Sequence, residues 1–348
     1  MARIFSTLAE FYTAPFDDVI DVRSPAEYAE DHIPGAISLP VLSDAERAQV
    51  GTIYTQEAPF KARKVGAALV ARNAAAHIEG PLAMRDGAWS PLVYCWRGGQ
   101  RSGSFASILQ QIGWRAEVVE GGYRSYRRLV VRAMHDIALP HRIVLLDGNT
   151  GTAKTEILQR LAARGAQILD LESLAAHRGS LFGAMAHPQP SQKAFEGAVA
   201  QVFDGLDPAR PVVLEAESSR IGNLQVPGSV WSAMRAARRV RLVAPLAARA
   251  RYLARAYADL TADHAALQAT LAKLIPFQGH DRVQDWQAMA TAGRFEDLAG
   301  ELMRLHYDSR YTKSRDGRDG ETLAEIALPD LGPGELDAAA DRIAALIV

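Results

Sequence analysis

The 348-residue sequence has little cysteine, little lysine and no excess of either charge. Cys95 is its single cysteine, which excludes an internal disulfide and a metal site built from cysteines alone. The chain has 39 basic and 40 acidic residues, and six of the basic ones are lysines. The near-zero net charge excludes non-specific binding of nucleic acid through overall charge. A local basic surface is still compatible with this net charge.

Long apolar runs are also missing. No run reaches the roughly 20 residues that a membrane-spanning helix needs. The opening residues, MARIFSTLAEF, contain Glu10 and lack the apolar core of a secretory signal. We therefore expect a soluble cytoplasmic protein without membrane association. Hydrophobic residues make up 48% of the chain, as in ordinary globular proteins, and at roughly 150 residues per domain the length predicts two domains with an extension.

Strand-like and helix-like segments alternate in the first third of the chain. The segment DDVIDVR (17–23) and the apolar run PLVYC (91–95) predict strands, and apolar residues at helical spacing predict a helix over 103–114. This alternation predicts an α/β domain with a parallel sheet over residues 1–135. A linker near 135–141 follows.

A second α/β unit is predicted over residues 140–245. Residues 142–165 are typical of a strand, a loop and a helix, and further strands are expected within 167–175, 211–218 and 240–245. From residue 246 to 348 the pattern is helical, which predicts a helical extension packed on the second unit.

Cys95 ends a predicted strand and is followed by WRGGQRS. Gly98 and Gly99 allow the chain to curl so that several N–H groups point inward, and the next helix adds its positive end. Arg97 and Arg101 add full positive charges. Such surroundings favour the thiolate, the nucleophilic form of cysteine, and they also suit a bound anion.

A phosphate-binding loop is predicted at GNTGTAKT, residues 148–155, between a strand and a helix. Gly148, Lys154 and Thr155 match the spacing of the G-x-x-x-x-G-K-[ST] pattern, and Gly151 is an additional glycine. Backbone N–H groups and Lys154 would hold a diphosphate, and Thr155 is suited to ligate Mg²⁺. Ala153 departs from the pattern, because glycine is usual there.

Other candidates follow the predicted strands of the second unit. Glu215 ends one strand, where phosphate-loop proteins often carry an acidic residue on the metal side. Arg178 and Arg220 lie in loops after strands, where ligands bind in open α/β sheets. Lys193 begins a helix, and we expect these loops to converge on the phosphate loop.

Basic residues recur at helical spacing in the predicted extension. Arg249, Arg251 and Arg255 are candidates for contacts with RNA phosphates, while a solvated charged face is the alternative.

Three segments resemble the rhodanese family: DVRSPAEYAEDHIPGAISLP (21–40), YCWRGGQRS (94–102) and VVEGGYRSYRR (118–128). The resemblance covers residues 1–135 and implies a rhodanese-like fold with Cys95 as the residue that carries sulfur or selenium. It also implies that Asp21 and Arg23 belong to a structural motif. Because no second cysteine exists, any transfer from Cys95 would go to an external acceptor.

The second half carries DLESLAAHRGSLFG (170–183), SQKAFE (191–196), EAESSRIG (215–222) and LHYDSRY (305–311). With the rhodanese-like unit before them, they closely resemble the tRNA 2-selenouridine synthase family. The implied fold class is α/β, with a rhodanese-like parallel-sheet domain, a P-loop NTPase-like domain and a helical C-terminal extension.

The resemblance implies a reaction in two steps on the wobble uridine (U34) of tRNA. The 2-thio sulfur is first alkylated with geranyl diphosphate, and selenium from selenophosphate then replaces it. Arg97, Gly98, Gly99 and Arg101 would attract selenophosphate beside Cys95, and the phosphate loop would hold the diphosphate. The partners are then selenophosphate, geranyl diphosphate and the tRNA anticodon loop. We expect no tightly bound cofactor and no resident metal site, with Mg²⁺ as an optional ion.

Two other functions stay open. One is a rhodanese-type sulfurtransferase with an accessory ATP-binding domain, for which loss of Cys95 abolishes all activity. The other is a P-loop kinase or ATPase with a non-catalytic rhodanese module, for which loss of Lys154 abolishes activity and loss of Cys95 does not.

Overall fold

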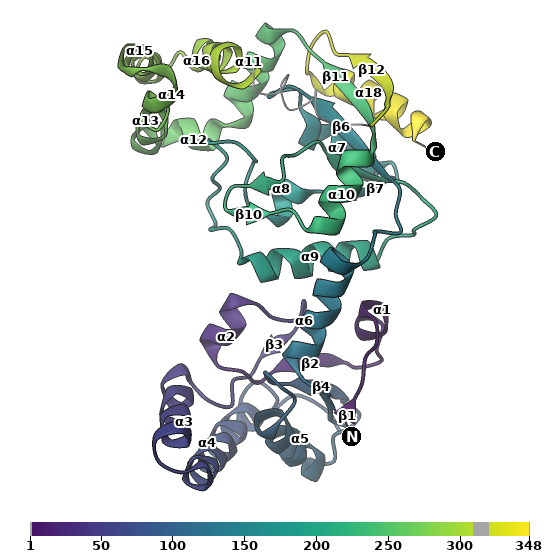
Figure 1. Cartoon of the computed structure of the whole chain (residues 1–348), viewed down its shortest axis with the longest axis vertical. Helices are drawn as coiled ribbons and strands as arrows, with labels where there is room; N and C mark the ends of the chain where they lie inside the picture. The colour runs from purple at the N-terminus through teal and green to yellow at the C-terminus, as the bar shows by residue number, and fades with distance from the viewer. Residues whose placement is uncertain (1, 309–319, 348) are drawn as a thin grey trace. The chain divides into compact units, whose positions relative to one another are not determined.

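A computed structural model describes residues 2–308 and 320–347. The chain divides into two compact units, which are described separately below. The first contains residues 1–137 and 190–205, and the second contains 138–189 and 206–348. Figure 1 shows both units with their elements labelled.

The first unit is built on a five-stranded parallel sheet with the strand order β1-β5-β4-β2-β3. Its central strand, β4, is buried along its whole length, as expected for a parallel sheet covered on both faces. The strands are β1 (Ala2–Arg3), β2 (Asp18–Asp21), β3 (Ile37–Ser38), β4 (Pro91–Tyr94) and β5 (Glu117–Val119).

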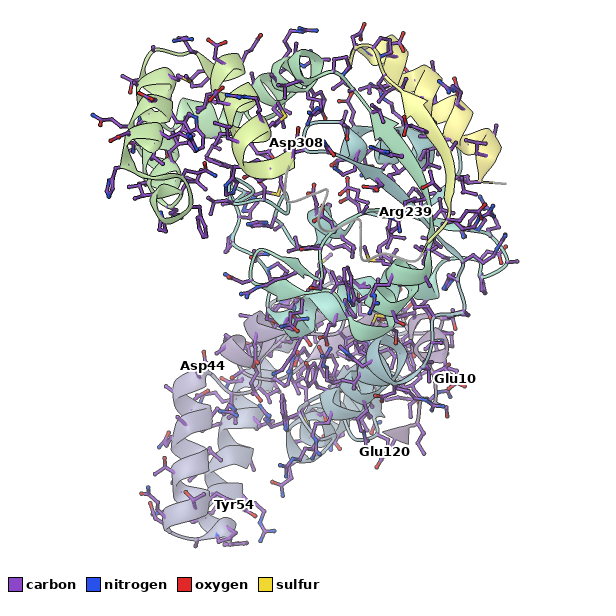
Figure 2. The ribbon with its side chains drawn as sticks, turned by 45° about the horizontal axis from the view of Figure 1, so that its top comes forward. Glu10, Asp44, Tyr54, Glu120, Arg239 and Asp308 are labelled. Atoms are coloured by element: carbon purple, nitrogen blue, oxygen red, sulfur yellow. The ribbon has the colours of Figure 1, made fainter. Side chains whose placement is uncertain are left out.

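Helices connect these strands, and local sequence signals mark their ends. Ser43 caps α3 with a capping box, Pro59 opens α4, and Gly113 ends α5 in the left-handed conformation. Figure 2 labels Asp44 and Tyr54 near the two ends of α3. The helical elements are α1 (Leu8–Tyr12), α2 (Pro25–Glu30), α3 (Asp44–Gln56), α4 (Pro59–Glu79), α5 (Gln100–Ile112), α6 (Tyr123–Val131), a π-helix η1 (Arg132–Asp136) and α9 (Gln192–Asp204).

The core of the first unit lies between the sheet and α4 and α5. Val93, Phe105 and Leu109 are fully buried in it, and Cys95 belongs to the same cluster. Cys95, the candidate nucleophile, is therefore held in place by core packing.

Helix α9 packs on the first unit, although its sequence lies within the predicted second domain, 140–245. Glu196 of α9 forms an ion pair with Arg127 of α6 and lies 3.2 Å from His135. Lys193 forms an ion pair with Glu30. Lys193 thus belongs to the first unit, and its convergence with the phosphate loop stays a prediction.

The second unit contains another five-stranded parallel sheet, with the order β12-β11-β6-β8-β7. Its strands are β6 (Ile143–Gly148), β7 (Gln167–Leu169), β8 (Val212–Glu215), β11 (Arg238–Val243) and β12 (Thr322–Ala327), and β9 (Arg220–Ile221) pairs with β10 (Leu224–Gln225) in a small separate hairpin.

Strand β12 corrects the prediction that 246–348 is helical throughout. Its sequence, TLAEIA, is rich in helix-forming residues, yet it pairs with β11 and buries Ile326. Hydrogen bonding along β11 and burial of the strand outweigh a weak local preference. Helix α18 (Pro333–Leu346) then returns against the sheet and α7, as Figure 1 shows.

The other helices of the second unit form two groups. Helices α7 and α18 bury residues such as Leu158 and Ile343 against the sheet, whereas α13 to α16 surround a separate core that contains Trp286 and Leu271. The helical elements are α7 (Lys154–Ala163), α8 (Leu171–Leu174), α10 (Gly228–Ala236), α11 (Leu246–Ala256), α12 (Ala258–Ala262), α13 (His264–Ala272), α14 (Ile275–Gln278), α15 (His280–Thr291), α16 (Phe295–Leu302) and a π-helix η2 (Met303–Tyr307).

The predicted α/β class, with two parallel-sheet units and helices in the C-terminal part, is confirmed. Across 2–308 and 320–347, no helix combines the length and the apolar character needed to cross a membrane.

Candidate functional site

Cys95 lies at the carboxyl end of β4, and α5 begins five residues later at Gln100. The side chain is buried with 4% exposure. The turn between β4 and α5 wraps around the sulfur, and the first turn of α5 directs its free N–H groups toward the same place. The predicted combination of thiol, curled loop and helix N-terminus is present.

Hydrogen bonds hold the sulfur of Cys95. Burial by itself raises the pKa of the thiol, but hydrogen bonds from the Ser102 hydroxyl and from the backbone N–H groups of Ser102, Arg97 and Gly99 outweigh it, so the net pKa is lowered. The Ser102 Oγ lies 3.2 Å from Cys95 Sγ. The site therefore favours the thiolate.

The Cys95 loop packs directly against the turn at Gly121 and Gly122. Gly122 has a φ of +59°, and a Cβ placed there would lie 2.2 Å from the Cys95 carbonyl oxygen and 2.4 Å from the Gly98 nitrogen. Gly98 has a φ of +65° and is equally close to the Gly121–Gly122 backbone. Two segments distant in sequence thus meet backbone to backbone, and only glycine leaves room at both positions.

Asp21 and Arg23 are buried in the interior of the first unit. The Arg23 guanidinium donates to both carboxylate oxygens of Asp21, with a shortest distance of 2.7 Å, and lies over the Tyr123 ring at 4.2 Å. Arg23 also donates to the backbone oxygen of Asp31. These contacts fix β2, α2 and α6 relative to one another, which is a structural role.

The two arginines of the Cys95 loop differ. Arg101 donates to Glu27 at 2.7 Å. Burial would raise the pKa of Glu27, but Arg101, aided by Arg47, lowers it to about 2, so most of the Arg101 charge is compensated. Arg97 is exposed, and its side chain has no partner among the residues that the structure describes. The uncompensated charge beside Cys95 therefore comes from Arg97 and the amides.

The phosphate loop occupies the turn from β6 to α7. Lys154 opens the helix, and its Nζ donates to the Gly148 carbonyl at 3.1 Å. Gly151 adopts a φ of +84° and is close to Leu253 and Arg249 of α11. The Thr155 hydroxyl donates to Glu172 at 3.3 Å. Gly148, Gly151, Lys154 and Thr155 are thus gathered in one turn, as their spacing predicts.

Ala153, the departure from the usual pattern, caps α7 in the left-handed conformation, with φ 57° and ψ 32°. A non-glycine residue pays roughly 1–2 kcal/mol for this conformation. Its methyl group is buried in the core with Val144 and Leu242, which offsets part of that cost. The loop therefore keeps its shape despite the substitution.

A cavity of about 600 Å³ opens over the phosphate loop. Arg178 contributes to its wall, where it pairs with Asp259 at 2.8 Å and stacks on Tyr257 at 4.8 Å. Arg220 is exposed, donates to the Gly222 carbonyl and is not among the lining residues. The structure brings Arg178 to the phosphate loop but does not place Arg220 there. The cavity is lined by residues 150–155, Asp170, Glu172, Ser173, Arg178–Leu181, Met185, Glu217, Ser218, Tyr252, Leu253, Ala256, Tyr257, His306 and Tyr307.

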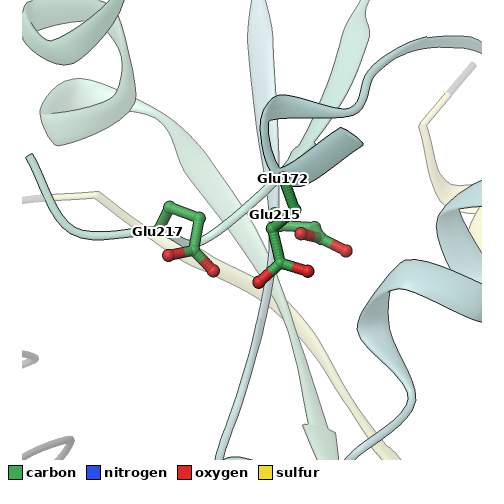
Figure 3. Close-up of side chains that lie close together, drawn as sticks. All are labelled: Glu172, Glu215 and Glu217. Atoms are coloured by element: carbon green, nitrogen blue, oxygen red, sulfur yellow. The ribbon is translucent and has the colours of Figure 1, made fainter. Parts of the chain in front are cut away.

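Three glutamates meet beside the loop: Glu172, Glu215 and Glu217 (Figure 3). Their nearest ligand oxygens lie within 4.8 Å of one another. Burial, followed by the charges of the other two glutamates, raises the pKa of Glu172 to about 9. Burial and the charge of Glu217 raise the pKa of Glu215 to about 7. Like charges held this close retain protons near neutral pH unless a cation joins them.

The acidic cluster fits a divalent cation. Glu215 is 1% exposed, and neither of its carboxylate oxygens has a hydrogen-bond partner among the described residues. Carboxylate and hydroxyl oxygens are the ligands that Mg²⁺ prefers. Glu215 was a candidate from the sequence. Glu217 was missed, although its place two residues beyond Glu215, the last residue of β8, was a usable signal.

A second, smaller pocket of about 80 Å³ adjoins the cavity and is apolar. The two share Thr150, Ser180, Leu253, Tyr257 and Tyr307. Beyond these shared residues, the pocket is lined by Phe182, Ala254, Leu260, Thr261, Leu267, Phe295, Leu298, Ala299, Leu302 and Met303. Sequence patterns gave no signal for this pocket, because its residues come from five separate segments.

The basic residues of α11 are not equivalent. Arg249 is buried, pairs with Asp308 at 2.8 Å and donates to the Thr150 carbonyl, so the expectation that it contacts RNA is wrong. Figure 2 labels Asp308. Arg251 and Arg255 are exposed, and their contact with RNA phosphates stays a prediction. The motif at 305–311 is described only as far as Asp308, and its last three residues lie outside the described part.

Profiles of two protein families match this chain. The profile described as "tRNA 2-selenouridine synthase AAA domain" matches residues 141–327, and "Rhodanese-like domain" matches residues 6–129. A curated tRNA 2-selenouridine synthase of Cupriavidus pinatubonensis is 35% identical over 90% of this chain and 86% of its own length. The chain belongs to the tRNA 2-selenouridine synthase family.

Other relatives match over a shorter span. The tRNA 2-selenouridine synthase of Nitrosomonas europaea is 33% identical over 66% of this chain and 61% of its own length. The aligned region thus covers about three fifths of several curated relatives of this family. A crystal structure of an N-terminal domain from Clostridium difficile 630 shares 33% identity over 37% of this chain and 98% of that chain, with a TM-score of 0.32.

Removing the Ser102 hydroxyl tests the hydrogen bonds to the thiolate. Because the net pKa of Cys95 is lowered, its thiolate persists below the pH at which an ordinary thiol is protonated. Ser102→Ala removes one donor, so the pKa rises and alkylation by iodoacetamide at neutral pH slows several-fold. The measurement is the pH dependence of the alkylation rate, to which no other cysteine contributes. Ser104→Ala on the same helix is the control, and equal midpoints in the two variants would contradict the assignment.

Gly122→Ala tests the contact between the two glycine turns. The added Cβ would collide with the Cys95 carbonyl, so we expect the free energy of unfolding to fall by roughly 2 kcal/mol or more, with slower alkylation of Cys95. Gly113→Ala is a matched control, because Gly113 also has a positive φ but its Cβ would meet nothing within 4 Å. Urea denaturation measures both. Equal losses would mean that backbone strain, and not the close contact, makes glycine necessary at 122.

Substitutions of Ala153 test the left-handed cap. In Ala153→Gly, relief of strain is offset by loss of a buried methyl group and by a more flexible unfolded chain, so stability changes by less than about 1 kcal/mol. Ala153→Val places a β-branched residue in the left-handed region, and we expect loss of inorganic diphosphate binding. Calorimetric titration with diphosphate compares the two. Unchanged binding by the valine variant would contradict the loop conformation.

Proposed function

We propose that the protein is a tRNA 2-selenouridine synthase that replaces the sulfur of 2-thiouridine at the wobble position by selenium, first through S-geranylation with geranyl diphosphate and then by exchange with selenophosphate. The observation that carries the proposal is the apolar pocket that adjoins the phosphate-loop cavity. Membership of the family supports the overall reaction. The proposal places the reaction in the cytoplasm, with the tRNA anticodon loop as partner and without a tightly bound cofactor.

The two adjoining pockets suit a ligand with an anionic head and an apolar tail. The phosphate loop offers backbone N–H groups, the N-terminus of α7 and Lys154 to a diphosphate. The adjoining pocket offers leucine, phenylalanine and methionine side chains, and none of its described lining residues carries a charge. A nucleotide base would leave its polar edge without partners there, which costs free energy. This arrangement favours an isoprenoid diphosphate over ATP.

In the first step, the 2-thio sulfur attacks C1 of the geranyl group. A carbon–sulfur bond forms, the C1–oxygen bond breaks, and diphosphate leaves with the electron pair. The N3 proton of the uridine is lost, which gives a neutral S-geranyl base. Lys154 and the loop amides stabilise the charge on the leaving diphosphate. Glu172, Glu215, Glu217 and Thr155 would hold a divalent cation, which supplies further charge neutralisation when it is bound.

In the second step, C2 of the S-geranyl base exchanges its sulfur. The Cys95 thiolate attacks C2, the C2–sulfur bond breaks, and geranyl thiolate leaves and takes a proton. Selenium of selenophosphate then attacks C2 and releases Cys95. Water cleaves the selenium–phosphorus bond, so that phosphate is formed and N3 regains its proton. Alkylation makes this exchange feasible, because an S-alkyl group leaves more readily than a thiocarbonyl sulfur.

Redox balance decides between two roles for Cys95. A perselenide on Cys95, as the rhodanese resemblance implies, contains selenium that is more oxidised than the selenium of selenophosphate. Its formation from selenophosphate would require an electron acceptor or reduction of phosphorus. Attack by the Cys95 thiolate at C2 needs neither. The lowered pKa of Cys95, with Arg97 and the loop amides beside it, supports a nucleophile and an adjacent anion site.

We expect Lys154→Ala to impair S-geranylation alone and Cys95→Ala to impair the selenium exchange alone. Lys154→Ala should reduce S-geranylation roughly hundredfold, as when a stabilising donor is removed, and should still convert RNA that is already geranylated. Cys95→Ala should accumulate S-geranyl-thiouridine and form no selenouridine. Mass spectrometry of nucleosides from thiolated tRNA, with geranyl diphosphate and selenophosphate supplied separately, measures both. Lys273→Ala, an exposed lysine of the same unit as Lys154, is the control.

Other outcomes would point to the other functions. Loss of every activity in Cys95→Ala, together with turnover of ATP, would favour a sulfurtransferase with an ATP-binding domain. Full activity in Cys95→Ala with none in Lys154→Ala would favour a P-loop kinase or ATPase. Either result would refute the division of labour between the two loops.

A further inference from the structure

Part of the apolar pocket beside the phosphate loop is lined by residues that the phosphate-loop cavity does not share. Its lining residues Leu267 of α13 and Phe295, Leu298 and Leu302 of α16 come from helices that contribute nothing to the phosphate-loop cavity. These four residues, called here the end wall, lie on the side of the pocket formed by those helices. The residues shared by the two pockets, such as Leu253 and Tyr257, form the entrance from the phosphate loop.

The end wall is backed by a packed core. Leu267, Leu298 and Leu302 belong to the helical cluster that contains Leu271, Val283 and Trp286, all with little or no exposure. Close-packed interiors resist deformation, and moving a buried leucine costs several contacts. The end wall therefore does not yield readily to a longer ligand.

The size of the pocket limits what it holds. Its volume is about 80 Å³, against a cavity of about 150 Å³ that takes up benzene. By this comparison the pocket holds roughly one five-carbon isoprene unit. With the diphosphate on the phosphate loop, the first isoprene unit lies at the shared entrance, beside Leu253 and Tyr257, and the second fills the pocket. A third unit would have to enter the space of Leu267 or Leu298.

We propose that the end wall of the apolar pocket sets the length of the isoprenoid donor at two units, with Leu298 as the main specificity-determining residue and Ala299 as the neighbour whose small size keeps the pocket open. This inference rests on the proposed function, because it concerns the donor of the first step. Leu298 and Ala299 both line the pocket, and Leu298 is 4% exposed. The expected preference is geranyl diphosphate over both dimethylallyl and farnesyl diphosphate.

The test compares the three diphosphates as donors to an anticodon stem-loop RNA that contains 2-thiouridine. Leu298→Ala deepens the pocket, and we expect the ratio of kcat/KM for farnesyl over geranyl diphosphate to rise roughly tenfold or more, as when a pocket gains or loses methylene groups. Ala299→Leu fills the pocket without opening a cavity. Geranyl transfer should then fall roughly tenfold relative to dimethylallyl transfer.

Leu271→Ala is the matched control. Leu271 is fully buried in the same helical core and on the same helix as Leu267, but it does not line the pocket. It should lower the melting temperature as Leu298→Ala does, since both create a cavity, and leave the donor ratio within about twofold of the wild-type value. The shift in melting temperature caused by each diphosphate gives a second readout that does not depend on transfer.

The outcomes separate the inference from the function on which it rests. An unchanged donor preference in both Leu298→Ala and Ala299→Leu, with geranyl transfer still measurable, would overturn the role of the end wall alone. If Leu298→Ala does not fold, Ala299→Leu decides the question by itself. Failure of the wild-type chain to transfer any of the three isoprenoids would overturn the proposed first step and the inference with it.

Discussion

The contact between the Cys95 loop and the turn at Gly121–Gly122 is the constraint on which the first unit's chemistry depends. Backbone atoms of the two segments touch, so their positions leave no space for a side chain at Gly122. The Tyr123 amide donates to the Cys95 carbonyl at 2.8 Å, and the Trp96 and Tyr123 rings stack above this contact at 5.3 Å. With its carbonyl held on one side, the loop turns its free amides toward the sulfur. The lowered thiol pKa thus depends on the Ser102 hydroxyl and on amides that backbone packing holds in place.

The second unit also has a loop of backbone amides at a helix N-terminus, and the arginines around that loop are paired. Arg178 pairs with Asp259, and Arg249 pairs with Asp308. In the first unit, Arg101 pairs with Glu27 in the same way. Arginines near both loops therefore serve mainly to position the chain. Arg97 and the backbone amides of the two loops are suited to small anions held by directed hydrogen bonds, and Lys154 lies in the second loop, where it donates to the Gly148 carbonyl.

Features carried by short sequence segments could be predicted. The turn around Cys95 and the loop from Gly148 to Thr155 each lie within eight residues, and their geometry follows from glycine positions and a following helix. Features that depend on distant segments could not. The sequence of β12 favours a helix until β11 offers a partner, and Arg249 looks like a surface residue until Asp308 is placed beside it. No short sequence segment indicates the apolar pocket, because the residues that α11, α13 and α16 contribute to it look like ordinary core residues.

The placement of α9 in the first unit has a consequence for how the chain is connected. The polypeptide passes from the first unit to the second after Ile137, returns before Pro190 and leaves again after Gly205. Two proteins fused end to end would be joined by one linker, whereas these units share three. A fragment that stops at residue 135 would lack Glu196, the ion-pair partner of Arg127, and would expose the face of α6 that α9 covers. Each unit is therefore assembled from two separate stretches of the chain, and neither can be exchanged for a homologous module by cutting the gene at one place.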